Sequence, residues 1–477
     1  MLKATAENSE MKVPEGFEDK RICIIGLGYV GLTLAVAMCD VGFQVHGVER
    51  NPHVLDCLSA GKAHFLERGL DERVAKHVNS GHFSFGAKIE PDDHRRVYII
   101  TVGTPLTSEK QTNLSAIQSV ARDVAEVLKP GELIMLRSTV RIGVTRDVVK
   151  PLLDSRDIPY ALAFCPERTL EGKAIEELTS LPQIVGGVDN GSTIRAKNIF
   201  GFLTPTVITV SSLEAAEMVK LVNNTQRDYM FAFANEVAEI CDVCSVSAIE
   251  VIRAGALNYP RAFNILPGPV GGPCLEKDPY ILTEGVVQKG GQEGLALRAR
   301  HFNEAMPSRS AALIASHRRG SNSATKKIVI FGLAFKGRPE TSDLRGSMAY
   351  PLIKHLQAHF PDAVIGGFDP STDPEEAKSF KIEIFDNAES AATDTDVIFF
   401  QTNNPRFQEL NLTRLSGLMR NGALIYDYWN QFKDVNLNEG RSYAGLGTWL
   451  TANPPSSLGN KKRTASAPAY AGSVEIV

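Results

Sequence analysis

One short run of glycines limits the architecture of this chain more than any other feature. Gly26-Leu27-Gly28-Tyr29-Val30-Gly31 follows the apolar run 21–25 and precedes the apolar stretch 32–38. The first run predicts a buried strand and the second stretch predicts a helix. A further strand, expected over 44–48, ends at Glu49. The order strand, GxGxxG, helix, strand and acid is the one that a dinucleotide-binding βαβ unit requires.

Each of these residue types has a physical use in such a unit. Gly26 makes the tight turn, Gly28 lets the backbone approach a pyrophosphate at the helix N-terminus, and Gly31 lets the helix pack closely on the strand. Glu49 lies near the offset at which an acid bonds the ribose 2′-hydroxyl, which favours NAD over NADP. The neighbouring Arg50 weakens that preference slightly. A tight turn without a ligand is the alternative interpretation.

The strand–helix alternation continues, and polar residues follow three successive expected strands. Strand 97–102 is followed by Thr104, strand 132–136 by Thr139, and strand 160–164 by Cys165-Pro166-Glu167. Ligands of an open parallel sheet bind at the carboxyl ends of its strands, so these residues are candidates for a site. Ordinary loop chemistry explains each of them equally well when it is taken alone.

A helix is expected over 213–244, because the stretch lacks Gly and Pro and has helical periodicity. Lys220, Asn224 and Asp228 recur at intervals of four residues, so they share one face. A solvated polar stripe is one interpretation. Apolar neighbours favour the other, in which the stripe is buried and needs partners such as a ligand. Cys241 and Cys244 of this helix are interpreted as packing residues.

The run 268–279 combines glycines with a cysteine and a Lys-Asp pair, Cys274, Lys277 and Asp278. Glycines let a backbone come close to a ligand. A thiol beside a fixed cation is held nearer to the thiolate, which is the nucleophilic form. The carboxylate can hold a proton or a water. The alternative is a Gly/Pro loop with a buried cysteine.

A second, smaller α/β domain is expected from the strand 327–331 onward, and its first loop carries Lys336, Arg338 and Arg345. This basic cluster suits an anionic diphosphate, and surface charge is the alternative. The fold class is therefore α/β, with two Rossmann-like doubly wound domains joined by a long central helix. The expected parts are an N-terminal tail (1–20), an NAD-binding domain (21–210), a central helical domain with the cysteine loop (211–320), a C-terminal domain (326–450) and a mobile tail (451–477).

Composition excludes several classes of function. The 477 residues are 43% hydrophobic and 22% charged, as in a soluble globular protein. Lys and Arg number 51 against 55 Asp and Glu, so no positive field would recruit nucleic acid or a membrane surface. No apolar run reaches transmembrane length. The seven scattered cysteines fit a reducing cytoplasm better than a disulfide framework.

Together these motifs resemble the UDP-glucose/GDP-mannose dehydrogenase family, over about residues 21–447. The resemblance is carried by Gly26 to Gly31, Val102-Gly103-Thr104-Pro105, Ser138-Thr139-Val140, Cys165-Pro166-Glu167-Arg168, Lys220-Leu221-Val222-Asn223-Asn224, the Cys274 loop, Gly332-Leu333-Ala334-Phe335-Lys336 and Asp343-Leu344-Arg345. It implies two Rossmann-like domains, a homodimer or higher homo-oligomer formed through the long helix, and two NAD-dependent hydride transfers at C6 of a UDP-sugar.

The resemblance also implies roles for individual residues. The expected catalytic residues are Cys274, Lys220, Asn224, Glu167, Asp278 and Thr139. The expected NAD contacts are Gly26, Gly28, Tyr29, Val30, Gly31, Glu49, Arg50, Thr104, Thr139, Glu171 and Lys277. The expected contacts to the nucleotide sugar are Glu167, Lys220, Arg261, Phe263, Gly271, Lys336 and Arg345. No metal is expected to take part.

The chemistry of the residues is consistent with that family. A thiolate traps the intermediate aldehyde as a thiohemiacetal, hydride loss gives a thioester, and water hydrolyses the thioester. Such a route needs one cysteine, an oxyanion stabiliser such as Lys220 or Asn224, and a base such as Glu167 or Asp278.

The sequence leaves three functions open, two that differ in the substrate and one without catalysis. The motif that begins at Cys165 is more similar to the UDP-N-acetylhexosamine branch of the family, so UDP-N-acetylmannosamine or UDP-N-acetylglucosamine is favoured. UDP-glucose is the alternative substrate. A non-catalytic NAD-binding regulatory protein is the alternative from another class.

Overall fold

The computed structural model describes residues 12–90, 96–262, 265–319, 324–432 and 435–448. The chain divides into two compact units. The first unit contains residues 1–225 and 277–294, and the second contains residues 226–276 and 295–477. Two expectations, the substrate residue Phe263 and the tail 451–477, lie outside the described residues.

The first unit is built on an eight-stranded sheet with the order β3-β2-β1-β4-β5-β6-β7-β8. Its strands are β1 (Arg21–Ile25), β2 (Gln44–Val48), β3 (Phe83–Gly86), β4 (Val97–Ile100), β5 (Leu133–Leu136), β6 (Ala161–Phe164), β7 (Gln183–Gly187) and β8 (Val207–Thr209). All neighbouring pairs are parallel except β6 and β7. The chain leaves β1 toward one edge of the sheet and returns beside it with β4, which makes this the switch point where such sheets bind ligands.

Helices cover both faces of this sheet. They are α1 (Tyr29–Asp40), α2 (Pro52–Ser59), α3 (Leu70–Asn79), α4 (Ser115–Val127), α5 (Lys150–Asp154), α6 (Ala174–Ser180) and α7 (Asn190–Phe200), and α10 (Asp278–Gln288) also belongs to the first unit. Successive side chains of a strand point to opposite faces. Ile22 and Ile24 of β1 accordingly join the core beneath α1, whereas Cys23 and Ile25 join the core beneath α4.

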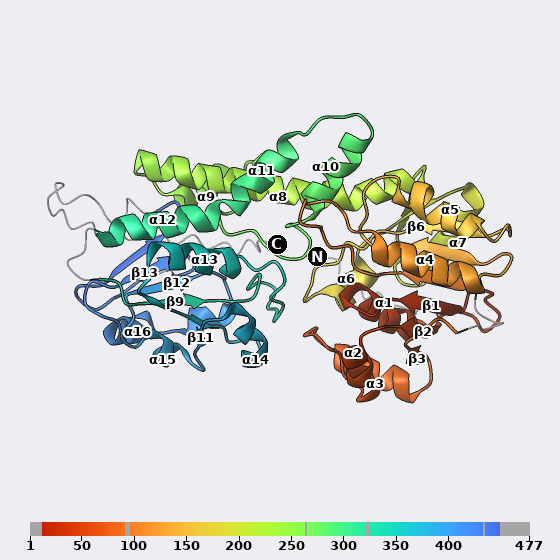
Figure 1. Cartoon of the computed structure of the whole chain (residues 1–477), viewed down its shortest axis with the longest axis horizontal. Coiled ribbons are helices and arrows are strands. Elements are labelled where there is room, and N and C mark those ends of the chain that lie inside the picture. The colour runs from red at the N-terminus through yellow and green to blue at the C-terminus, as the bar shows by residue number, and fades with distance from the viewer. Residues whose placement is uncertain (1–11, 91–95, 263–264, 320–323, 433–434, 449–477) are drawn as a thin grey trace. The chain divides into compact units, whose positions relative to one another are not determined.

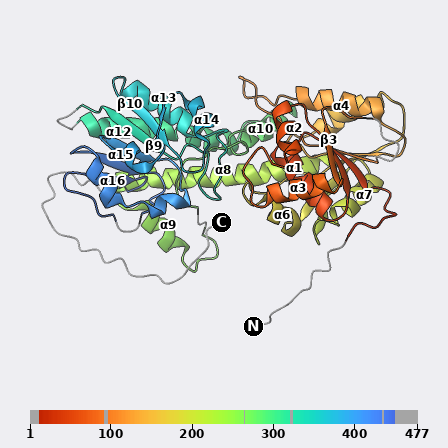
Figure 2. The same cartoon turned by 90° about the horizontal axis from the view of Figure 1, so that it is seen from below.

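The helix α8 (Leu213–Cys244) has 32 residues and is continuous in both views (Figures 1 and 2). Its bounds are the expected ones. The chain passes from the first unit to the second within it, after Thr225. Lys220 is 9% exposed and Asp228 is fully buried, so the polar stripe is not a solvated face.

The second unit contains a six-stranded parallel sheet with the order β11-β10-β9-β12-β13-β14. The strands are β9 (Lys327–Phe331), β10 (Val364–Phe368), β11 (Glu383–Ile384), β12 (Val397–Phe400), β13 (Leu424–Asp427) and β14 (Ser442–Gly445). The helices are α9 (Ala248–Ala256), α11 (Leu295–Glu304), α12 (Met306–Arg319), α13 (Ala349–His359), α14 (Pro374–Ala377), α15 (Ala388–Ala392) and α16 (Leu412–Leu418).

Helices lie on both faces of this sheet (Figure 1), and each face has its own hydrophobic core. Ile328 and Ile330 of β9 pack with α12 and α13, whereas Val329 and Phe331 pack with α15 and α16. The expectation of two doubly wound α/β domains with a long central helix is confirmed. In the part of the chain that the structure describes, no helix is long and apolar enough to cross a membrane.

Candidate functional site

The turn between β1 and α1 has the geometry that its glycines predict. Gly26 has φ +92°, a left-handed value that L-residues avoid. A Cβ on Gly31 would lie 1.9 Å from the Gly26 carbonyl oxygen, so only glycine allows this packing of helix on strand. A Cβ on Gly28, the N-cap of α1, would meet nothing within 4 Å. The open side at the helix N-terminus fits an approaching pyrophosphate.

The acid at the end of β2 is fixed by backbone donors. Glu49 accepts hydrogen bonds from Leu27 N–H and from Asn51 N–H, each at 2.9 Å. The first of these bonds ties the carboxylate to the glycine turn. Arg50 instead forms an ion pair with Asp123 of α4 at 2.8 Å. The expected NAD residues Glu49 and Arg50 are therefore held by different elements of the first unit.

A further acid, Glu67, connects the glycine turn with the loop before α6. Tyr29 donates its hydroxyl to Glu67 Oε2 at 2.5 Å. The backbone N–H groups of Gly172 and Ala174 donate to the same carboxylate at 2.8 and 2.9 Å. The expected NAD residues Tyr29 and Glu171 thus belong to segments that one buried carboxylate links. Sequence reasoning missed Glu67, since no motif marks it.

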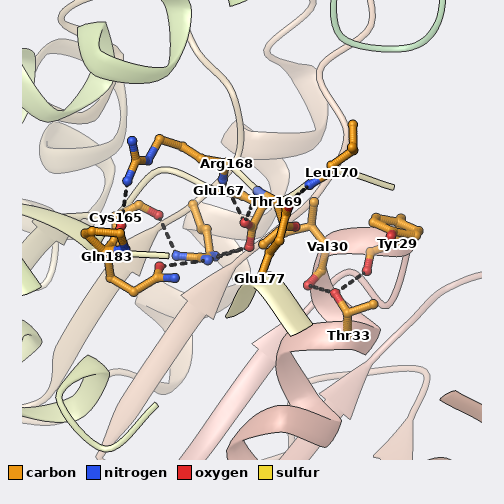
Figure 3. Close-up of polar contacts among 12 residues, drawn as sticks. Tyr29, Val30, Thr33, Cys165, Glu167, Arg168, Thr169, Leu170, Glu177 and Gln183 are labelled. Atoms are coloured by element: carbon orange, nitrogen blue, oxygen red, sulfur yellow. Dashed lines mark hydrogen bonds and ion pairs between the residues drawn. The ribbon is translucent and has the colours of Figure 1, made fainter. Parts of the chain in front are cut away.

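Glu167 lies in a dense polar cluster after β6, which Figure 3 shows with its partners. Arg137 donates to Glu167 Oε2 from Nε at 3.0 Å and also from a terminal nitrogen. The N–H groups of Arg168 and Thr169 donate to Oε1 at 2.7 and 2.8 Å. Gln183 of β7 accepts from Arg137 at 3.1 Å. Donors on both oxygens therefore fix the orientation of the Glu167 carboxylate.

The charge on Glu167 is set by these neighbours. Burial alone raises the pKa of this carboxyl, but Arg137, the Thr169 N–H and Lys220 outweigh it and leave the pKa below its ordinary value. Glu167 is consequently a carboxylate at neutral pH. Arg137 is 1% exposed and was not among the expected site residues, although a charge at the end of an apolar strand was a usable signal.

Two further expected pairs come together in the first unit. Thr104 Oγ1 donates to the Thr139 carbonyl oxygen at 2.5 Å, so the loops after β4 and β5 are in contact. Asn224 of α8 donates to Asp278 Oδ2 at 2.6 Å, and Lys277 Nζ lies 3.3 Å from Asp278 Oδ1. Asp278 is fully buried at the start of α10.

The cysteine loop belongs to the second unit, where close backbone packing fixes it. Cys274 itself is exposed. Gly272 N–H donates to the Gly346 carbonyl oxygen at 2.9 Å, and a Cβ on Gly271 would lie 2.2 Å from the same oxygen. A Cβ on Gly272 would lie 2.4 Å from the ring of Phe335. At its start, Gly268 lies against the ring of Trp429, where a Cβ would come within 2.8 Å.

The expected sugar-nucleotide residues of the second unit lie on two segments. Lys336 directly follows Phe335, whose ring lies against Gly272. Arg345 directly precedes Gly346, whose carbonyl oxygen lies against Gly271. The basic loop after β9 is therefore packed on the cysteine loop. Arg345 is bonded to Asp343 through Nε at 2.9–3.0 Å. Arg261 is exposed and stacks on Tyr259, with its guanidinium carbon 4.7 Å from the ring centroid.

The burial of the other cysteines corrects one expectation. Cys241 is buried, as a packing residue should be, but Cys244 is exposed at the end of α8. It faces solvent because the helix ends there. Cys23, Cys39 and Cys165 are buried and Cys57 is intermediate, so Cys244 and Cys274 are the two exposed thiols of the chain.

The comparisons with known proteins cover most of the chain. Family models of the UDP-glucose/GDP-mannose dehydrogenase family match its NAD binding domain at residues 20–204, its central domain at 214–305 and its UDP binding domain at 329–434. An NDP-N-acetyl-D-galactosaminuronic acid dehydrogenase from Ralstonia nicotianae is 31% identical, with 83% of this chain and 93% of that protein covered.

Solved structures agree with these matches. A UDP-D-ManNAc dehydrogenase from Pyrococcus horikoshii superposes with a TM-score of 0.79 at 30% identity, covering 90% of this chain and 99% of that one. A UDP-N-acetyl-mannosamine dehydrogenase from Staphylococcus aureus has a TM-score of 0.77 at 27% identity, covering 90% and 99%. The chain belongs to the UDP-glucose/GDP-mannose dehydrogenase family and carries that family's NAD-binding, central and UDP-binding domains.

Proposed function

We propose that this chain oxidises the C6 hydroxyl of a UDP-N-acetylhexosamine to the carboxylate, with Cys274 as the covalent nucleophile. The observation that carries the proposal is the packing of the exposed-thiol loop on the basic loop of Lys336 and Arg345. A diphosphate held by those two cations would bring its sugar to the thiol. Guanidinium and ammonium groups are the side chains best suited to an anionic diphosphate.

NAD fits the first unit through the left-handed turn at Gly26, the open side of Gly28 and the anchored carboxylate of Glu49. When bound, NAD accepts a hydride in each of the two oxidations. Residues of the chain itself carry out the covalent and hydrolytic steps. The Cys274 thiolate adds to the aldehyde carbon, and after the second oxidation water displaces the thiolate from the thioester.

The buried polar groups of the first unit suit the charges that develop on the way. Lys220 and Asn224 are donors for an oxyanion. Glu167 and Asp278 are the carboxylates available to take a proton from the hydroxyl or from the hydrolytic water. The lowered pKa of Glu167 keeps it in the form that accepts a proton. Asn224 already orients Asp278 through a 2.6 Å hydrogen bond.

Reduction of NAD with a panel of nucleotide sugars tests the proposal. The wild-type protein should form NADH with UDP-N-acetylmannosamine or UDP-N-acetylglucosamine and release the uronate. Cys274→Ser should fold and bind NAD but lose acid production, because an alkoxide is far harder to form than a thiolate. Cys244→Ser, which removes the other exposed thiol, is the matched control and should keep wild-type turnover. Near wild-type turnover of Cys274→Ser would overturn the thioester route.

The choice of N-acetylhexosamine over glucose rests on the segment after β6. Two of the relatives above are named for N-acetylmannosamine. In this chain Arg168 donates to the Pro182 carbonyl oxygen at 2.5 Å. The Cys165-Pro166-Glu167-Arg168 motif is therefore hydrogen-bonded to the residue directly before β7. We therefore expect kcat/KM for a UDP-N-acetylhexosamine to exceed that for UDP-glucose, and a higher value for UDP-glucose would reject this choice.

We also propose that the protein is at least a dimer. One face of α8 exposes Tyr229, Phe233, Ile240 and Val243, the last at 82%. An exposed row of apolar side chains on one helix, here interrupted only by the exposed Glu236, is the type of surface that partner chains cover. Light scattering coupled to size exclusion should give twice the chain mass or more for the wild type. Phe233→Glu should shift it toward the monomer, and an unchanged mass would contradict this surface.

A further inference from the structure

A fully buried polar cluster in the second unit joins α8, α11 and the cysteine loop. Asp228 and Asn235 lie seven residues apart on α8, and Arg300 and Asn303 lie three residues apart on α11. All four side chains have 0% exposure. Residues spaced in this way share one helix face. The two helices thus present their polar groups to each other in a region that excludes water.

Arg300 contacts the loop on both sides of the cysteine. Its Nη1 donates to Asp228 Oδ1 at 2.8 Å and to the Leu275 carbonyl oxygen at 3.0 Å. Its Nη2 donates to the Val270 carbonyl oxygen at 3.0 Å. One guanidinium therefore ties together two loop carbonyls, five residues apart, that bracket Cys274.

Two asparagines complete the cluster. Asn303 Nδ2 donates to Asp228 Oδ1 at 3.0 Å and to the Asp228 carbonyl oxygen at 2.9 Å. Asn235 Nδ2 donates to Asn303 Oδ1 at 3.0 Å and to the Gly268 carbonyl oxygen at 3.1 Å. Gly268 N–H returns a bond to Asn235 Oδ1 at 2.8 Å. The loop is consequently held at Gly268, Val270 and Leu275 from this side, and at Gly271 and Gly272 from the side of the basic loop.

Stability alone does not account for this arrangement. Burial raises the pKa of Asp228 to about 6, in spite of Arg300 and Asn303, so the carboxylate is not well compensated. Among the described residues, Asp228 Oδ2 and Arg300 Nε lack hydrogen-bond partners, although Arg300 Nε lies 3.7 Å from Glu304 Oε1 in an ion pair. Apolar residues of similar volume are often as stabilising as a buried ion pair. What they cannot do is donate to two backbone carbonyls.

We propose that Arg300 is a positioning residue, which fixes the Cys274 thiol by bridging the Val270 and Leu275 carbonyls, with Asp228 and Asn303 orienting it. This role rests on the proposed function of Cys274. The guanidinium is planar, with five N–H donors in fixed directions, so it can serve two carbonyls and a carboxylate at once. A lysine ammonium is a compact charge that cannot span the same three acceptors. The basis is the hydrogen-bond geometry, and nothing here requires Arg300 to touch substrate.

The test compares Arg300→Lys, Asp228→Asn and the control Arg309→Lys. Asp228→Asn keeps the side-chain volume and removes the charge that orients Arg300, so it serves if Arg300→Lys does not fold. Arg309 of α12 also pairs with an acid on α8, Glu239, but both groups are about two-fifths exposed and neither is bonded to the loop. Turnover and hydrogen exchange of the peptide over 268–276 are measured for each variant.

A displacement of about 1 Å can cost about a hundredfold in rate. We therefore expect kcat of Arg300→Lys to fall by about ten- to a hundredfold, with KM for NAD within about twofold of the wild type. Exchange of the loop amides should accelerate, while peptides of α8 and α11 stay protected. Asp228→Asn should change both readouts in the same direction by less, and Arg309→Lys should change neither.

Unchanged loop exchange would overturn the proposal, and so would either of two kinetic results. One is a kcat of Arg300→Lys within about twofold of the wild type. The other is a loss of kcat with uniform loss of protection across the second unit, which marks a purely structural role. If the wild type oxidises no nucleotide sugar, the proposed function fails, while unchanged loop exchange in Arg300→Lys would still refute the bridging role by itself.

Discussion

Replacing Arg137 by methionine should destabilise the first unit strongly. It should also reverse the sign of the contribution that Glu167 makes to the pH dependence of that unit's stability. Arg137 is the largest fully buried side chain of the Glu167 cluster, and its guanidinium also lies over the ring of Phe200, 5.0 Å from the centroid. Arg137→Met keeps most of the volume but leaves the buried Glu167 carboxylate without the cation that is hydrogen-bonded to it. Removing one partner of such a pair costs about 3–5 kcal/mol.

That cost is large enough to measure directly. For a domain of this size, about 2–4 °C in Tm corresponds to each kcal/mol, so the first unit should melt on the order of 10 °C lower. Arg146→Met is the matched control, because Arg146 pairs with Glu214 while 41% exposed. A surface pair of that kind contributes about 0–1 kcal/mol. Urea unfolding followed by circular dichroism would give both values.

The sign of the pH dependence follows from the pKa of Glu167. In the wild type that pKa lies below its ordinary value, so the stability contributed by Glu167 is present above the ordinary pKa and is lost as pH falls through the lowered one. In Arg137→Met, burial dominates and the pKa should rise above its ordinary value. The stability that protonated Glu167 contributes is then present at acidic pH and is lost as pH rises through the raised pKa. Equal losses in Arg137→Met and Arg146→Met at neutral pH would refute the reasoning.

Three further outcomes are expected. NAD should be used with a higher kcat/KM than NADP, because the Glu49 carboxylate is fixed beside the glycine turn, and equal values would reject that role. Lys336→Ala should raise KM for the nucleotide sugar by about ten- to a hundredfold, the equivalent of a charged hydrogen bond, with KM for NAD nearly unchanged. A raised KM for NAD alone would contradict the assignment. Gly31→Ala should lower both Tm and NAD affinity, since its Cβ would lie 1.9 Å from the Gly26 oxygen, and calorimetric titration with NAD would show whether affinity survives.

The parts of the fold that local sequence determines were predictable. The unit β1–α1–β2 follows from a glycine pattern between apolar runs, and α8 follows from 32 residues without Gly or Pro. The strand β7 has only two large apolar residues among its five, Ile184 and Val185, so its pattern does not mark a strand. Its antiparallel pairing with β6 depends on partners distant in the sequence.

The candidate site divides in the same way. Residues within motifs, such as Glu167 and Cys274, could be predicted because the motif itself carries the chemistry. The residues that hold them could not. Arg137 is thirty positions from Glu167, and Arg300 is seventy-two from Asp228, so only the folded chain brings each pair together. Arg137 carries one usable signal, a charge directly after an apolar strand, whereas the segment around Arg300 is rich in polar residues and gives none.

The contact between Gly268 and the Trp429 ring places a natural fluorescence probe at the cysteine loop. The chain has two tryptophans, and the other, Trp449, lies outside the described residues. The Trp429 indole is only partly exposed and donates its N–H to the Gln401 carbonyl oxygen at 2.9 Å, so this bond orients the ring, whose six-membered part lies against Gly268 of the loop. Indole emission depends on local polarity. A Trp449→Phe protein would therefore carry a single tryptophan, at the base of the loop, so that excitation selective for indole over the eleven tyrosines could follow loop displacement in stopped flow without a dye.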